Sequence, residues 1–434
     1  MLEAGWSVAD ITPDVGTDLS GFGGRSGPNE GIHDRLRAKA LCLGDGATRA
    51  VVLTADLIGL DAATVDEIRQ GARDRLGGDT PGIMVACSHT HSGPATPCLP
   101  FLGEPDGDYM ARLTAALVQL VVDATETMAP ARVGVGQAEA CVGINRRERT
   151  DQGSIVLGHN PGGEHAPYLD MLKVERENDQ AWLLSHAAHP VTLGGDNLLV
   201  SADWPGYAQR QTEAALGDGA VALFAQGCCG NINSEPRGTF EVAEAHGQAI
   251  ADAVTASAPA IEMSDSVPVS VKSIVVDLPL EDPPSVDQAR EILSQMEADL
   301  ADHAEADGYG MGKTRRGLVA WAKRIAELSE AGATGLTLPF EIQAIRLGDT
   351  VIVGLPGEVF VEYQRQIKAN SPFAHTFVFA YTNGNPGYVP TEAAFPQGGY
   401  EVTQAVRYYG TTMLTPECER LIVGAAGELV CSLK

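Results

Sequence analysis

The sequence predicts an α/β protein with a mixed sheet, flanking helices and an inserted αα-hairpin. Three observations carry this prediction. Short β-rich runs alternate with helical patterns in the first half, two helical patterns follow each other within 283–332, and a two-residue hairpin signal comes after them. Alternating strands and helices are typical of α/β folds. The chain shows no internal repeat, linker or low-complexity tract, so we predict one domain over residues 1–434.

The predicted strands begin with a β-hairpin. Apolar runs at 38–43 and 50–54 flank a polar stretch that begins Gly44-Asp45-Gly46, which is a turn signal. Residues 83–87 form another short apolar run, and apolar side chains at helical spacing predict an amphipathic helix over about 107–127. Further strands are expected near 132–137, 169–175, 181–187 and 220–225, a helix over 240–256, and a last β-hairpin from 340–347 and 350–353 around Gly348-Asp349.

The αα-hairpin is expected at about 283–332. Ser285 and Gln288 fit a capping box that opens its first helix. After Gly308-Tyr309-Gly310, a second helix presents an apolar face. The hairpin either covers a site entrance or serves only as packing surface, and the sequence leaves both readings open.

Charge and composition exclude several classes of partner. The formal net charge of −27 argues against nucleic acid and anionic membranes, which require positive patches. No apolar run approaches the roughly 20 residues of a membrane-spanning helix, and the N-terminus lacks the features of a signal peptide. The eight cysteines are scattered without C-x-x-C spacing, as in reduced cytoplasmic proteins. We therefore expect a cytoplasmic protein that binds neither nucleic acid nor a membrane.

Candidate metal ligands begin in the run Ser88-His89-Thr90-His91-Ser92-Gly93-Pro94. If the strand of 83–87 continues through this run, its two imidazoles leave the same face of the sheet, because side chains alternate with period two. They then share a metal, or one binds it while the other faces substrate. A pair of surface or hydrogen-bonded histidines is the alternative, since the H-x-H pattern alone is weak.

Two further candidates end apolar runs. His189 comes directly before Pro190, whereas His186 would point to the opposite face and is expected to be an ordinary structural histidine. Glu358 follows a strand and a tight turn and opens a predicted helix, where an acid also simply complements the helix dipole. Two histidines and one carboxylate from separate strand ends are a common catalytic zinc set that leaves a position for water.

Several motifs, taken together and in order, resemble the neutral ceramidases. They are His89-Thr90-His91-Ser92-Gly93-Pro94, Ile144-Asn145-Arg146, His189-Pro190, Pro356-Gly357-Glu358, Gly387-Tyr388-Val389 and Gly399-Tyr400-Glu401, with Ala9-Asp10-Ile11-Thr12-Pro13 at the start. The resemblance covers nearly the whole chain. It implies a ceramidase-like α/β catalytic domain that is a zinc amidase.

The resemblance also implies roles for individual residues. The zinc ligands that it implies are His89, His189, Glu358 and Tyr388. His91 would lie beside the metal and face substrate, and Arg146 would bind substrate or hold a carboxylate. Tyr400 would donate a hydrogen bond to the developing oxyanion.

The chain departs from the family pattern in two ways. The family's G-D-V-S-P element aligns with Gly230-Asn231-Ile232-Asn233-Ser234, so Asn231 and Asn233 replace an aspartate and a serine. Asparagine is neither a nucleophile nor a base, but its amide can donate a hydrogen bond, so we expect both residues to contact substrate. The chain also ends soon after the last motif, so we expect no C-terminal β-sandwich domain and disfavour ceramide as the substrate.

The sequence thus predicts a zinc-dependent hydrolase that cleaves the amide bond of a small, non-ceramide N-acyl substrate by metal-activated water. His91 is the first candidate to protonate the leaving nitrogen. A zinc-dependent esterase or lactonase is an alternative, because its transition state is similar. A non-catalytic metal-containing binding protein is another, because the aspartate and the serine are lost. A homo-oligomer is compatible with the sequence.

Overall fold

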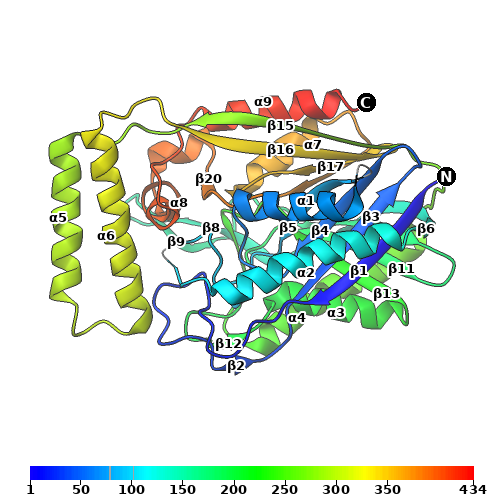
Figure 1. The fold of residues 1–434 in the computed structure, drawn as a ribbon, viewed down its shortest axis with the longest axis horizontal. Coiled ribbons are helices and arrows are strands. Elements are labelled where there is room, and N and C mark those ends of the chain that lie inside the picture. The colour runs from blue at the N-terminus through cyan, green and yellow to red at the C-terminus, as the bar shows by residue number, and fades with distance from the viewer. Residues whose placement is uncertain (78–79, 101) are drawn as a thin grey trace.

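Three β-sheets meet around a shared buried core, and helices cover their outer faces (Figure 1). The computed structural model describes residues 1–77, 80–100 and 102–434. Leu41, Val52, Leu183, Leu223 and Phe379, which come from all three sheets, are each no more than 1% exposed. Strands buried on both faces have near-continuous apolar sequences rather than alternating ones. This is why short apolar runs indicated the sheet strands.

The three sheets are mixed, with parallel and antiparallel neighbours. The first has the order β5-β4-β3-β1-β6, the second β13-β11-β10-β7 and the third β15-β16-β17-β19. Their strands are β1 (Glu3–Asp10), β3 (Arg37–Gly44), β4 (Arg49–Ala55), β5 (Gly82–Cys87), β6 (Ala129–Pro130), β7 (Arg132–Glu139), β10 (Tyr168–Glu175), β11 (Gln180–His186), β13 (Ala220–Gln226), β15 (Val269–Pro279), β16 (Thr337–Leu347), β17 (Thr350–Gly354) and β19 (His375–Phe379).

Shorter strands form small ladders beside these sheets. Two pairs of two-residue strands and one three-stranded ladder lie in the connections. They are β2 (Gly31–Ile32) with β12 (Leu199–Val200), β18 (Glu358–Val359) with β20 (Tyr388–Val389), and β14 (Ile232–Ser234), β8 (Gly143–Arg149) and β9 (Ile155–Asn160).

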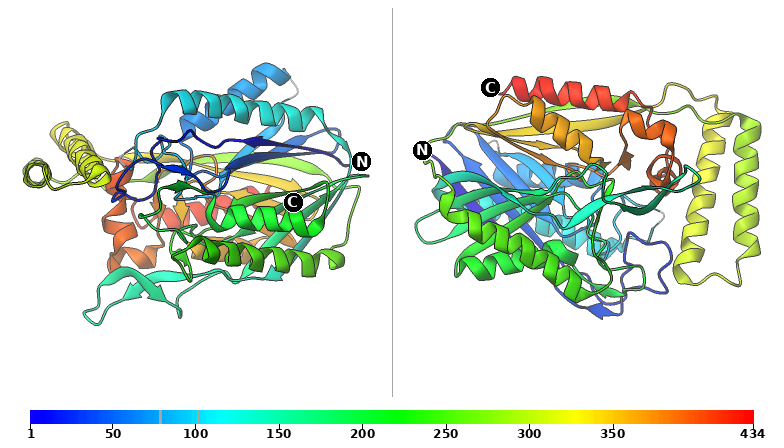
Figure 2. Two further views of the ribbon diagram at one scale, coloured as in Figure 1. Left: turned by 90° about the horizontal axis from the view of Figure 1, so that it is seen from below. Right: turned by 180° about the vertical axis from the view of Figure 1, so that it is seen from behind.

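Each sheet has its own pair of helices on the outside (Figure 2). Helices α1 (Ala62–Leu76) and α2 (Gly107–Glu126) cover the first sheet, α3 (Asp203–Leu216) and α4 (Phe240–Ser257) the second, and α7 (Val361–Asn370) and α9 (Cys418–Cys431) the third. Helix α2 shows why these segments are helical. Asp106 caps its first turn by accepting from the Tyr109 N–H, and Leu113, Leu117 and Leu120 bury one face.

The predicted αα-hairpin is confirmed as α5 (Val286–Asp302) and α6 (Tyr309–Glu330), with the capping box of Ser285 and Gln288 in place. It stands at one end of the molecule, beyond the sheets (Figure 1). Helix α6 makes the contacts with the rest of the chain. Thr314 Oγ1 donates to the Gly23 carbonyl at 3.1 Å, and Trp321 Nε1 donates to the Thr411 carbonyl at 3.0 Å.

Both predicted β-hairpins and the mixed α/β fold class are confirmed. The single-domain organisation stays a prediction. None of the described helices is long and apolar enough to cross a membrane. The cysteines are free thiols, and only Cys141 and Cys431 are exposed.

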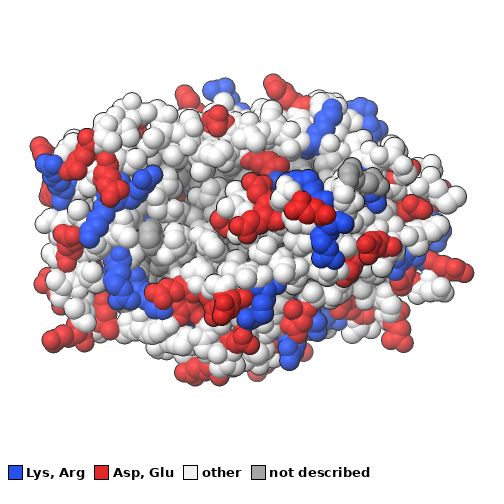
Figure 3. All heavy atoms as spheres, viewed as in Figure 1, with Lys and Arg blue, Asp and Glu red and all other residues white. Residues whose placement is uncertain are grey.

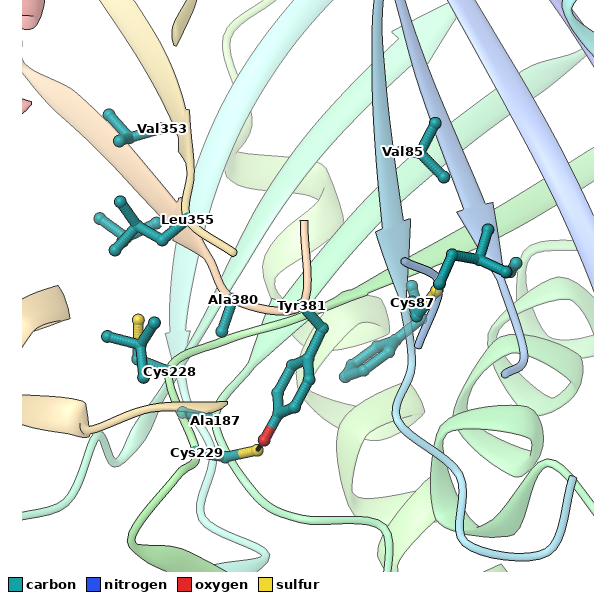
Figure 4. Close-up of a cluster of buried hydrophobic side chains, with 14 of the residues drawn as sticks. Val85, Cys87, Ala187, Cys228, Cys229, Val353, Leu355, Ala380 and Tyr381 are labelled. Atoms are coloured by element: carbon teal, nitrogen blue, oxygen red, sulfur yellow. Dashed lines mark hydrogen bonds between the residues drawn. The ribbon is translucent and has the colours of Figure 1, made fainter. Parts of the chain in front are cut away.

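The carboxyl ends of strands from all three sheets converge on one region. The Cys87 N–H at the end of β5 donates to the Tyr381 carbonyl at 3.2 Å, and the Ala380 N–H donates to the Gln226 carbonyl at the end of β13 at 3.0 Å. Figure 4 shows this meeting point, where Cys87 ends β5 and Ala380 and Tyr381 follow β19. Ligand sites of α/β proteins commonly lie at such strand ends.

Candidate metal centre

His89 and His91 meet through a turn and not through a strand. Strand β5 ends at Cys87, and His89 has a left-handed φ of 66°, which is uncommon outside glycine. The expectation that the strand continues through both histidines is therefore wrong. The His89 N–H donates to the Leu57 carbonyl at 2.8 Å, which holds the turn against the end of β4. The two Nε2 atoms nevertheless lie 3.2 Å apart.

Backbone carbonyls fix the tautomers of His89 and His189. His89 Nδ1 lies 2.6 Å from the Ile58 carbonyl, and His189 Nδ1 lies 2.5 Å from the Cys229 carbonyl. Because a carbonyl oxygen only accepts, each Nδ1 carries a proton, and Nε2 is the nitrogen left to bind a metal. Such carbonyl partners are typical of metal-binding histidines.

Glu358 does not open a helix, and that expectation is also wrong. It lies in β18, and α7 begins only at Val361. Strand β18 pairs in parallel with β20, and Glu358 is the register partner of Tyr388. The two strands approach closely because Gly357, with φ +81°, has no Cβ; an added one would lie 2.5 Å from the Gly387 carbonyl. Helix-dipole compensation therefore does not explain this buried acid.

The lone pairs of these side chains point at one another. Glu358 Oε2 lies 2.9 Å from His189 Nε2 and 3.4 Å from His89 Nε2. Burial, together with the nearby Arg146, lowers the pKa of His189 to about 4. Burial opposes ionisation of Glu358, but its contacts with His89 and His189 hold its pKa well below the usual range. The carboxylate oxygen and the two Nε2 atoms thus converge on one buried point, which is the arrangement that a cation stabilises.

The donor set fits a zinc ion. The ligand atoms of His89, His91 and His189 lie within 4.8 Å of one another, and Glu358 adds a carboxylate oxygen beside them. Imidazole nitrogens and a carboxylate oxygen are common zinc ligands. His91, predicted to face substrate, has Nε2 within this group, while its buried Nδ1 has no hydrogen-bond partner among the described residues. Burial and the two neighbouring histidines lower its pKa well below the usual value.

Arg146 connects the candidate ligands to the rest of the site. Its Nε donates to Glu401 at 2.9 Å, one Nη to Asn233 at 3.1 Å and the other to the Tyr388 hydroxyl at 3.0 Å. Its first Nη also lies 3.4 Å from His189 Nε2. The carboxylate partner of this buried guanidinium is thus Glu401. The substrate-binding role predicted for Arg146 stays a prediction.

Tyr388 and Tyr400 lie next to each other at this centre, with ring centroids 5.7 Å apart. Burial raises the pKa of Tyr388 well above its usual value, and the Glu358 carboxylate adds to this effect while Arg146 opposes it. Burial likewise raises the pKa of Tyr400. Among the residues that the structure describes, none is a hydrogen-bond partner of the Tyr400 hydroxyl. Both phenols are therefore neutral donors.

The two asparagines have different surroundings. Asn231 Nδ2 donates to the Glu362 carboxylate at 2.9 Å, and its Oδ1 accepts from the Val361 N–H at 2.9 Å. Its amide therefore holds the start of α7. Asn233 faces the site, where its Oδ1 accepts from Arg146. The substrate-binding roles expected for both residues stay predictions.

Sequence reasoning missed two tyrosines at the centre. Tyr381 stacks on the His89 ring with centroids 4.0 Å apart, and its hydroxyl lies 3.2 Å from Cys229 Sγ (Figure 4). The Tyr409 hydroxyl donates to Glu358 Oε1. The turn-rich stretch 382–387 marks the neighbourhood of Tyr381, but no local pattern identifies Tyr409.

The loop that precedes β2 forms a wall beside His91. The Phe22 ring lies 5.0 Å from the His91 ring, and an added Cβ at Gly21 would lie 2.4 Å from His91 Nδ1. Helix α6 braces this loop through the Thr314 contact with Gly23. On the face seen in Figure 3, the surface is hollowed between the hairpin and helices α1 and α2, and mainly uncharged side chains line the hollow. The hairpin therefore supports a wall of the site.

Comparison with known proteins identifies the family. The sequence model described as neutral/alkaline non-lysosomal ceramidase, N-terminal, matches residues 2–267. The chain belongs to this family. The neutral ceramidase of Pseudomonas aeruginosa is 26% identical over 246 residues, which cover 53% of this chain. That match spans only 36% of the length of the relative.

Two solved ceramidase structures share the fold. The crystal structure of neutral ceramidase from Pseudomonas aeruginosa superposes with a TM-score of 0.73 at 19% identity, covering 100% of this chain and 74% of the other. A ceramidase complexed with C2 superposes with a TM-score of 0.74 at 18% identity, covering 100% of this chain and 75% of the other. The ceramidase-like fold predicted from the ordered motifs is thus confirmed.

Proposed function

We propose that this protein is a zinc-dependent hydrolase that cleaves the amide bond of a small N-acyl compound. The observation that carries the proposal is the convergence of Nε2 of His89, Nε2 of His189 and the Glu358 carboxylate in a buried position. Membership of the ceramidase family supports amide hydrolysis, because a ceramide is itself an N-acyl amide. Asn231 and Asn233 stand where the family pattern has an aspartate and a serine, which argues against ceramide itself as the substrate.

Zinc would be held by His89, His189 and Glu358, with Tyr388 beside them. A zinc ion in such a set lowers the pKa of a water molecule to about 7 and polarises a carbonyl group. We assign His91 to the substrate side, because its ring lies between Phe22 and His89. There its imidazole is the candidate to pass a proton to the leaving nitrogen.

The tyrosines and Arg146 would act on the developing negative charge. The Tyr400 hydroxyl is a neutral donor that is free to hydrogen-bond a substrate oxygen, and one such donor typically contributes about 3 kcal/mol. Arg146 adds a buried positive charge whose orientation Glu401 fixes through a 2.9 Å hydrogen bond. The same guanidinium directs the Tyr388 hydroxyl at 3.0 Å. The chain would thereby hold donors in place before substrate arrives.

The proposal is tested by metal content and product analysis together. The purified protein should retain about one zinc per chain after dialysis, as expected for one site with three protein ligands and an open position for water. It should release free amine from a panel of small N-acyl compounds. The matched esters in the same panel test the alternative of an esterase or lactonase. Turnover of esters alone would contradict the amide assignment, and stoichiometric zinc without any turnover would favour a binding protein.

Metal content of single variants separates the assigned roles. His189→Ala or Glu358→Ala should lose tightly bound zinc while remaining folded by circular dichroism. His91→Ala should keep zinc and lose at least about a hundredfold in turnover, the usual contribution of a general acid. Undiminished zinc in both ligand variants would remove the proposed site. Loss of zinc from His91→Ala would mean that His91 is itself a zinc ligand.

A further inference from the structure

The two carboxylate oxygens of Glu358 have different partners. Oε2 faces the imidazoles, at 2.9 Å from His189 Nε2 and 3.4 Å from His89 Nε2. Oε1 points the other way and accepts a hydrogen bond from the Tyr409 hydroxyl. A phenol at neutral pH is a donor, whereas an ionised carboxylate only accepts, so the direction of this bond is unambiguous. Oε2 thus lies among the imidazoles, with the Tyr381 hydroxyl 3.5 Å away, whereas Oε1 is held by Tyr409.

The Tyr409 ring is confined by its surroundings. Tyr409 is the last residue of the short 3-10 helix η3 (Ala405–Tyr409), and Gly410 follows with a left-handed φ of 73°. The ring packs against Gly387, where an added Cβ would lie 3.2 Å from it. It also crosses the Tyr388 ring at 88° with centroids 6.4 Å apart. The hydroxyl therefore cannot swing away from Glu358 without repacking its neighbours.

We propose that Tyr409 is a positioning residue, which holds Oε1 of Glu358 so that Oε2 faces the histidines. The torsion that turns a glutamate carboxylate about its last bond is broad, so burial alone does not select one orientation. A hydrogen bond to one oxygen removes that freedom and fixes the plane of the group. The inference rests on the proposed metal centre, and it concerns how well the chain prearranges that centre.

The alternative is that Tyr409 only fills space. Tyr408 makes this alternative testable, because it lies in the same turn and packs on the same small buried cluster, which contains Ile58 and Leu102. Within the described part of the chain, the Tyr408 hydroxyl has no hydrogen-bond partner. Removing the hydroxyl from Tyr408 therefore perturbs the same neighbourhood without touching Glu358.

The test measures zinc affinity of the full chain by competition with a chelator. Tyr409→Phe should raise the zinc dissociation constant about 10- to 100-fold, the usual effect of losing a partner of a metal ligand. It should also shift the visible absorption of the cobalt-substituted protein, because the carboxylate geometry changes. Tyr408→Phe should leave both quantities unchanged, and both variants should keep a cooperative unfolding transition when metal-free.

A double-mutant cycle separates positioning from general weakening of the fold. In Glu358→Asp, the shorter acid lies out of reach of residue 409, so the further change Tyr409→Phe should cost no additional zinc affinity. An additive loss in this background would overturn the inference, as would wild-type affinity and an unchanged cobalt spectrum in Tyr409→Phe. Failure of the wild-type protein to bind zinc would instead overturn the proposed function together with this inference.

Discussion

His186 and His189 come from the same short run, are both buried, and both have a pKa that burial lowers to about 4. Their hydrogen bonding differs. His186 Nδ1 lies 2.8 Å from the Tyr168 carbonyl, and its Nε2 accepts from the Val142 N–H at 3.4 Å. His189 also has a carbonyl at Nδ1, but its Nε2 faces a carboxylate.

This difference shows what identifies a metal ligand. Burial and a lowered pKa are common to both histidines, so neither property distinguishes a ligand from a structural residue. The groups beside Nε2 do distinguish them: in His186 the neighbour is the backbone N–H of Val142, whereas in His189 the Glu358 carboxylate lies at 2.9 Å and Arg146 Nη at 3.4 Å. Imidazoles and a carboxylate that converge in a buried place form a cation site, whereas a histidine whose two nitrogens both meet backbone groups needs no ion.

The largest expected effect follows from exchanging each histidine for glutamine. His189→Gln should lower zinc affinity more than about 100-fold, because a neutral amide replaces an imidazole ligand. His186→Gln should retain zinc at the wild-type level, since its lone pair is already satisfied. Elemental analysis after dialysis distinguishes the two. Equal zinc loss from both variants would contradict the distinction between His189 as a ligand and His186 as a structural residue.

An intermediate effect is expected on stability as a function of pH. The folded metal-free protein keeps His186 neutral down to about pH 4, whereas the unfolded chain protonates it near pH 6.5. The unfolded state therefore binds more protons between these values, and the free energy of unfolding should fall as pH drops from 6.5 to 4. For His186 this amounts to about 3 kcal/mol.

The measurement compares urea unfolding of the metal-free wild type and His186→Gln from pH 7 to pH 4. The variant should lose less stability across this range, because its side chain does not titrate. Parallel curves for the two proteins would mean that His186 is not held neutral by the fold.

The smallest effect is expected beside His189, at Asn233. Asn233→Ser removes the acceptor of Arg146 but leaves the lone pair of His189 in place. Zinc binding should therefore be unchanged, while kcat/KM falls about tenfold, as expected for one hydrogen bond to a charged group. Asn231→Ser is the comparison, because the Asn231 amide holds the start of α7; it should lower stability, and a fall in kcat/KM beyond this loss would support its predicted contact with substrate. A fall in the zinc content of Asn233→Ser would instead show that the hydrogen bond between Asn233 and Arg146 is needed for metal binding.

Local patterns predicted much of the fold. The capping box at Ser285 and the turn at Gly348-Asp349 depend only on residues that are close in sequence. Both features were therefore predicted correctly. The ordered motifs that resemble the neutral ceramidases likewise predicted that His89, His189 and Glu358 lie together.

The rest depends on contacts between distant segments, which no local pattern encodes. The left-handed turn at His89 is held by the carbonyl of Leu57, and β18 exists only because β20 pairs with it. Tyr409 was missed for the same reason, since 51 residues separate it from Glu358. The predictions of a continued strand through His89 and of a helix opened by Glu358 failed at these non-local contacts.

The long separations within the centre also bear on how the chain folds. His189 and Glu358 are 169 residues apart, and Arg146 and Tyr388 are 242 apart. Contacts of such high contact order form only after the entropy of closing the intervening loops has been overcome, so the centre is assembled late in folding. A metal ion that binds there therefore binds the native state and not partly folded states. It stabilises the native state by mass action.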